Sequence, residues 1–169
     1  KRTAQGIRYC INKKCDIINC SIAGPMDNDL EDAINEAYSK GIIVVSATGN
    51  DGRNMLLYPA SYLNCISVGS INKSLDISPF SNYNVFMTMV APGEDIIFDI
   101  NGEKIKDSGT SFSAPLVSGT LALLKEKLKE ELGRKPEYSE LYNELIKNCV
   151  IVNNIDRIKQ GHGYLDFSA

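Results

Sequence analysis

The sequence is poor in several features that would point to particular functions. No apolar run reaches the roughly 18 residues that a membrane-spanning helix needs. The basic residues form no run longer than two, and 18 basic against 21 acidic residues give a net charge of −3. This balance gives no reason to expect a nucleic-acid partner. There is also only one histidine, His162, which limits both metal binding and acid–base chemistry.

The cysteines do not form a recognisable framework. The chain has five of them, an odd number, and three are separated by intervals of five residues: Cys10, Cys15, Cys20, Cys65 and Cys149. This is neither a zinc-ligand spacing nor a paired disulfide pattern. The sequence therefore favours buried free thiols and, with them, a reducing compartment.

A strand–helix–strand unit is the clearest local pattern. The residues from 16 to 22 are apolar and β-branched, and helical spacing of apolar side chains follows after Asp27 or Asn28. Residues 42–47 are apolar on both faces, as in a central parallel strand. The pattern predicts a βαβ unit, with functional residues at the carboxyl ends of its strands.

The remaining elements extend this unit to one α/β domain or most of one. We expect helices over 3–13, 111–131 and 140–148, the last capped by Ser139, and strands over 65–70, 80–82, 87–91 and 96–100. The first half of the long helix is apolar nearly all round, which predicts that it is buried. With 43% hydrophobic residues in 169, the composition supports a substantial core. The expected fold is a three-layer α/β arrangement, a largely parallel sheet with helices on both faces.

Two polar residues follow predicted turns. Ser111 comes just after Gly109 at the start of the long helix, where the helix dipole favours developing negative charge. Serine and threonine are also ordinary helix caps, so Ser111 alone does not establish a nucleophile. Asn50 follows the 42–47 strand, but Asn-Asp-Gly is equally common turn chemistry.

The string Gly-Thr-Ser-Phe-Ser-Ala-Pro, residues 109–115, followed by Gly119, resembles the serine signature of the subtilisin-like serine proteases, or subtilases. The segments 44–52, 90–93 and 161–165 resemble other subtilase segments in the same order, so the resemblance covers nearly the whole chain. It implies a serine endopeptidase in which Ser111 is the nucleophile. Asn50 would then donate to the oxyanion.

The same resemblance assigns a peptide-binding cleft. Ser21, Ile22 and Ala23 would offer their backbone to an extended substrate, with Gly24 beside them. The opposite wall of the cleft would be formed by Ala47, Thr48 and Gly49. Leu57 would lie near its floor, and Thr110, just before the nucleophile, would also bind substrate. Without the resemblance, these stretches would read as a buried strand, a Gly-Pro turn and core packing.

A subtilase triad also needs an aspartate and a histidine, and their motifs, Asp-Ser/Thr-Gly and His-Gly-Thr, do not occur upstream of Ser111. His162 lies in the closing Gly-x-Gly turn, where the family has no catalytic residue. The first residue is not Met, and we expect residues 1–169 to be the C-terminal portion of a subtilase catalytic domain. The alternative is a non-catalytic relative that binds peptides.

The expected partners follow from this interpretation. They are a peptide or protein substrate, and either the N-terminal half of the same protease or a second chain covering an open sheet edge. No cofactor is evident; subtilases often bind calcium, but the sequence has no dense acidic loop to which ligands can be assigned. A nucleotide-binding domain is disfavoured because no glycine-rich phosphate motif follows a strand. The resemblance points to a secreted protein and the thiols to a reducing compartment, so localisation stays open.

Overall fold

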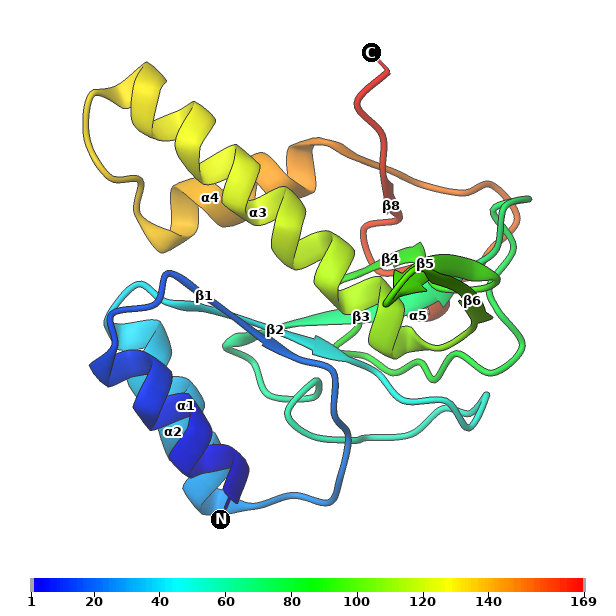
Figure 1. Ribbon diagram of the computed structural model, residues 1–169, viewed down its shortest axis with the longest axis horizontal. Helices are drawn as coiled ribbons and strands as arrows, with labels where there is room; N and C mark the ends of the chain where they lie inside the picture. Colours follow the sequence, from blue (N-terminus) through cyan, green and yellow to red (C-terminus); the bar gives the residue numbers. More distant parts are fainter. Residues whose placement is uncertain (1, 169) are drawn as a thin grey trace.

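A six-stranded sheet organises the chain in the computed structural model, which describes residues 2–168 (Figure 1). The strands lie in this order across it: β1 (Ile17–Cys20), β2 (Ile43–Ala47), β3 (Cys65–Ile71), β4 (Met89–Pro92), β8 (Tyr164–Leu165) and β7 (Cys149–Val150). All neighbouring pairs are parallel except the last, β8 with β7. The predicted α/β class with a largely parallel sheet is therefore confirmed.

Two helices that run side by side in the same direction, α1 (Arg2–Asn12) and α2 (Asn28–Ser39), cover one face of the sheet (Figure 1). Of the two cap candidates in the sequence, Asp27 and Asn28, Asp27 caps α2: its side chain accepts a hydrogen bond from the Leu30 amide at 3.2 Å. The apolar sides of both helices pack on β1 and β2 in a single buried cluster. The helical spacing in the sequence thus identifies the faces that meet the sheet.

The opposite face carries the long helix α3 (Thr110–Leu132) and α4 (Tyr138–Lys147) (Figure 1). Leu121 and Leu145 are fully buried in this second cluster. One side of α3 is nevertheless open, since Leu116 is 47% and Leu123 75% exposed. The prediction that the first half of α3 is buried all round is therefore wrong for this side.

Some predicted boundaries differ from the structure. Residues 80–82 form a turn and coil: the Ser81 amide donates to the Ser78 carbonyl within the turn, and the Asn82 amide donates to the carbonyl of Gly49 in a loop. Helix α4 starts one residue before Ser139, and Glu137 and Glu140 form its capping box. The sequence analysis also did not anticipate the short helix α5 (Arg157–Gln160) or strands β7 and β8.

The dipeptide Asn101-Gly102, a sequence typical of tight hairpin turns, joins β5 (Ile96–Ile100) to β6 (Glu103–Asp107). Both turn residues have positive φ, 56° and 86°, which is the backbone that a two-residue hairpin turn requires. The hairpin stands outside the main sheet, next to the start of α3 (Figure 1). Phe98 of the hairpin packs on Phe112, with ring centroids 5.3 Å apart.

Strand β1 forms one edge of the sheet. Among the described residues it pairs with β2 and with no strand on its other side. Lys125 of α3 and Lys135 both reach Asp16, just before this strand, at 2.6 and 2.9 Å. None of the helices within residues 2–168 combines the length and apolar character needed to cross a bilayer.

Two leucines in the same helix give a matched test of this packing. We expect Leu121→Ala to lower the free energy of unfolding by about 2–5 kcal/mol, because it opens a cavity in the core. Leu123→Ala should change it by less than about 0.5 kcal/mol, because that side chain is exposed. Urea unfolding of the two variants measures both values. Equal losses would contradict the burial described for α3.

Candidate active site

The turn that begins α3 lies where the parallel strands end. Gly109 is the N-cap residue of α3, and Ser111, half-buried, is the second residue of the helix. The Gly109 amide donates to the carbonyl of Gly93, just after β4, at 2.7 Å. The structure thus places the predicted nucleophile at the carboxyl edge of the sheet, where ligand sites of such folds form.

A hydrogen-bonded junction joins this turn to Asn50. The Asn50 carboxamide oxygen, Oδ1, accepts from both the backbone amide and the hydroxyl of Thr110, each at 2.9 Å. The Thr110 hydroxyl oxygen in turn accepts from the Gly49 amide at 3.2 Å. Because Oδ1 is committed to Thr110, the carboxamide orientation is fixed and its Nδ2 remains the outward donor.

Asn50 and Ser111, sixty positions apart in the sequence, therefore meet in one region. A Cβ placed on Gly109 would lie 3.3 Å from Asn50 Nδ2, so this donor sits directly over the backbone that leads into Ser111. Thr110, which the sequence analysis grouped with substrate-binding residues, is fully buried. Its side chain forms the junction rather than a cleft surface.

Close backbone approach explains two glycines here. A Cβ on Gly93 would collide with the hydroxyls of Ser113 and Ser70. Gly49 has φ +103°, and a Cβ there would lie 2.6 Å from Asn82 Nδ2 and 2.8 Å from Leu57 Cδ1. Gly93 is needed because the exit of β4 packs against the start of α3, and Gly49 because its positive φ and the adjacent Asn82 and Leu57 side chains leave no room for a Cβ.

Asn82 is a residue that sequence reasoning missed. It is fully buried, and its Oδ1 accepts from the amides of Asp51 and Arg53 at 2.9 and 3.2 Å. Its Nδ2 donates to the Thr48 carbonyl and to Asp51. Asn82 thus holds the loop that presents Asn50. A single asparagine in a turn carries no sequence signal for such a role.

The loop after β1 approaches the turn from the other side. The Ser21 hydroxyl donates to the Ser111 carbonyl at 2.9 Å. Ile22 and Ala23 are exposed, whereas the backbone of Gly24 exchanges two hydrogen bonds with Tyr58. The polar backbone groups of Gly24 are therefore already paired within the chain.

The other predicted cleft residues are mostly internal. Ala47 and Thr48 are 2% and 1% exposed, and Leu57, half-buried, packs against Gly49. Ile22, Ala23 and Gly24 border a cavity of about 330 Å³, which Thr3, Leu30 and Tyr58 also line. The residues predicted for the opposite wall of the cleft, Ala47, Thr48 and Gly49, do not line this cavity.

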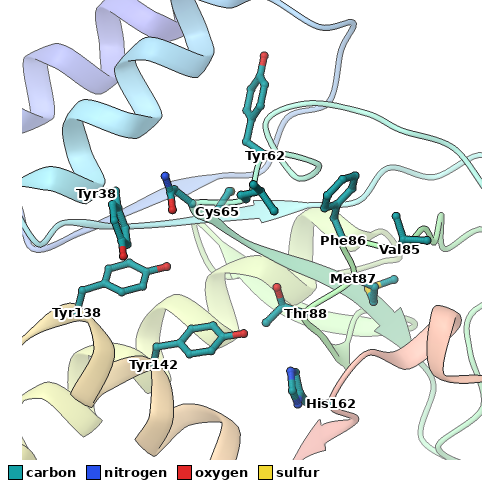
Figure 2. Close-up of a pocket in the computed structure, with 12 residues that line it drawn as sticks. Tyr38, Tyr62, Cys65, Val85, Phe86, Met87, Thr88, Tyr138, Tyr142 and His162 are labelled. Carbon is teal, nitrogen blue, oxygen red and sulfur yellow. The ribbon is translucent and has the colours of Figure 1, made fainter.

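His162 lies near the amino ends of the parallel strands, whereas the Ser111 turn lies at their carboxyl ends. Its backbone amide donates to the carbonyl of Thr88, just before β4, whereas the Ser111 turn is bonded to Gly93, just after it. Five residues of extended strand separate these points by about 16 Å. Figure 2 shows His162 facing Thr88 in a tyrosine-lined pocket of about 400 Å³. Burial and the charge of Arg157 lower the pKa of His162.

The thiol of Cys20, next to Ser21 in the sequence, is held in its protonated form. All five cysteines are free, and burial raises the pKa of Cys20, beside Ser21, to about 11. At neutral pH this group is a thiol rather than a nucleophilic thiolate. Within residues 2–168, no group of three or more potential ligand side chains is arranged to hold a metal ion.

The Asn50–Thr110 junction can be tested with two isosteric substitutions in α3. Thr110→Val removes the hydroxyl and leaves the Gly49 amide and one Asn50 contact unpaired, so we expect a loss of about 1–3 kcal/mol in stability. Thr120→Val removes only a bond to a carbonyl of the same helix, on its outer side, and should have little effect. Urea unfolding measures both; a Thr110→Val variant as stable as Thr120→Val contradicts the junction.

Comparison with known proteins gives the same picture for the whole chain. The subtilase family model (Peptidase S8) matches residues 1–163. The chain is 39% identical to the major intracellular serine protease of Bacillus subtilis (strain 168), covering 97% of this chain and 53% of that protein. It is 40% identical to the intracellular serine protease of Paenibacillus polymyxa, covering 98% and 52%. The chain therefore spans about half the length of the curated relatives it matches.

Solved structures agree with the fold. The prenylagaramide maturation protease PagA superposes with a TM-score of 0.87 at 32% identity, over 96% of this chain and 63% of that one. The patellamide maturation protease PatA superposes with a TM-score of 0.86 at 28% identity, over 96% of this chain and 64% of that one. The match of the family model over nearly all residues, together with these relatives, shows that this chain belongs to the subtilase family of serine proteases.

Proposed function

We propose that residues 1–169 form the nucleophile-bearing C-terminal portion of a serine endopeptidase catalytic domain. The observation that carries the proposal is the bonding of Asn50: Oδ1 is held by Thr110, so Nδ2 is presented beside the backbone that leads into Ser111. A hydroxyl at a helix N-terminus with an oriented amide donor close by is the arrangement that acyl transfer needs.

In the proposed reaction, the Ser111 hydroxyl oxygen attacks the peptide carbonyl and its proton passes to a general base. The carbonyl oxygen becomes negative and accepts from Asn50 Nδ2. The Ser111 amide, one of the first N–H groups of α3 and so without an intrahelical acceptor, is placed to donate as well. The base then returns the proton to the leaving amine, and water releases the acyl group by the same steps.

The general base has to come from outside these residues, because the sole histidine lies at the amino ends of the strands and Ser111 at their carboxyl ends. The unpaired side of β1 and the open side of α3 are the surface on which a segment carrying the missing aspartate and histidine would dock. On α3 this surface consists of Leu116, Gly119 and Leu123, spaced three to four residues apart on one side of the helix. Its occupant would be the N-terminal half of the same protease or a second chain.

The oxyanion role of Asn50 can be separated from its structural role. Asn50→Asp keeps an oxygen that accepts from Thr110 but replaces the Nδ2 donor with a negative oxygen. We expect kcat of the complete protease on a peptide substrate to fall at least about 10²–10³-fold, with folding retained. Steady-state kinetics and circular dichroism measure the two properties. A correctly folded variant with unchanged kcat would remove Asn50 from the mechanism.

The missing base makes a second prediction. A fluorophosphonate probe should not label Ser111 in the isolated 169-residue chain, but should label it in the complete protease, where Ser111→Ala abolishes the reaction. Leu123→Glu should prevent labelling of the complete protease by disrupting the proposed docking surface. Lys129→Glu serves as the control, because Lys129 is also exposed and lies further along the same helix. Rapid labelling of the isolated chain would show that no added segment is required.

A peptide-binding protein without catalysis is the alternative outcome of the same experiment. A complete protein that binds peptides yet neither reacts with the probe nor cleaves them would establish it.

A further inference from the structure

A proline interrupts the helix that carries Ser111. Pro115 lies inside α3, four residues after Ser111. In an α-helix the carbonyl of residue 111 accepts from the amide of residue 115, but proline has no N–H to donate. The proline ring also crowds the ordinary position of that carbonyl. The carbonyl of the proposed nucleophile therefore lacks its helical donor.

Ser21 supplies a donor at this point. Its hydroxyl donates to the Ser111 carbonyl at 2.9 Å, across ninety positions of sequence. The Ser21 oxygen accepts in turn from Asn19 Nδ2 at 2.9 Å. Asn19 Oδ1 lies 3.0 Å from the hydroxyl of Ser118, which shares its hydrogen between Asn19 and the Ala114 carbonyl. Ser111 and Ser118 are seven residues apart, on the same side of α3, so the chain of bonds runs from the helix to β1 and back to the helix.

We propose that Ser21 is a positioning residue for Ser111: it replaces the helical hydrogen bond that Pro115 withholds and so fixes the first turn of α3. This goes beyond the backbone role in substrate binding expected for Ser21. The inference rests on the proposed function only for its catalytic consequence. The replacement of one hydrogen bond by the other depends on the fold alone.

The arrangement has a reason in the geometry of the site. The amide of Thr110 is held by Asn50 and the hydroxyl of Ser113 by the Ala91 carbonyl, at 2.9 and 3.1 Å. Ser111 lies between these anchors, and its own side chain has to stay free to react. The carbonyl of Ser111 can be held without engaging its hydroxyl, and Ser21, just after β1, donates to this carbonyl.

Restoring the helical donor should make Ser21 dispensable. We would prepare Ser21→Ala, Pro115→Ala and the double variant, in which the amide of residue 115 can donate to Ser111. The ¹³C resonance of the Ser111 carbonyl should shift in Ser21→Ala and return toward the wild-type value in the double variant. The urea midpoint should fall in Ser21→Ala and recover in the same way. Effects that simply add in the double variant would overturn the replacement.

The catalytic consequence needs the complete protease. Loss of one ordinary hydrogen bond should reduce kcat by about 5–10-fold with KM little changed. Ser21→Thr, which keeps the hydroxyl, should restore it, as should Pro115→Ala in the Ser21→Ala background. Ser39→Ala, at the exposed end of α2, is the control. Loss of stability with unchanged kcat would leave Ser21 a purely structural residue and overturn its positioning role.

The two proposals fail in different ways. A complete wild-type protein without peptidase activity would contradict the proposed function, and the carbonyl shift and urea midpoints would still decide whether Ser21 replaces the bond lost at Pro115. An active protease whose kcat does not respond to Ser21→Ala would contradict only the positioning role.

Discussion

The bonding of Asn50 Oδ1 to Thr110 is the constraint on which the rest of the site depends. It couples the exit of β2 to the first turn of α3 through a buried threonine that also binds the Gly49 amide. Because the Asn50 Oδ1 is bonded within the fold, the orientation of the carboxamide is set and Nδ2 points outward. A single junction thus sets both the helix start and the direction of the candidate oxyanion donor.

The surrounding parts of the fold support this junction. Asn82 holds the loop before and after Asn50, glycine at 49 and 93 allows close approach, and Ser21 reaches the α3 turn from β1. These contacts come from the exits of β1, β2 and β4 and from the loop between β3 and β4, so the site exists only when the parallel sheet is formed. Preorganised polar groups of this kind need no rearrangement at the moment of reaction.

Much of the fold was predictable from local patterns, and the site only in part. Residues 42–47 are apolar on both faces and lie centrally, and the spacing after Asp27 marks α2, because burial dictates those patterns. The proximity of Asn50 and Ser111 was expected from the family resemblance. The roles of Asn82 and the Ser21 side chain were not predictable, because a long-range hydrogen bond leaves no periodic trace. The open side of α3 was missed because its leucines look like core residues.

A structure of the complete protease with a covalent phosphonate on Ser111 tests the account most directly. The phosphoryl oxygen of such an adduct occupies the position of the oxyanion. We predict that this oxygen lies within about 2.7–3.1 Å of Asn50 Nδ2, with Oδ1 still bonded to Thr110. An adduct whose oxygen points away from Asn50, or in which Asn50 has left Thr110, would contradict it.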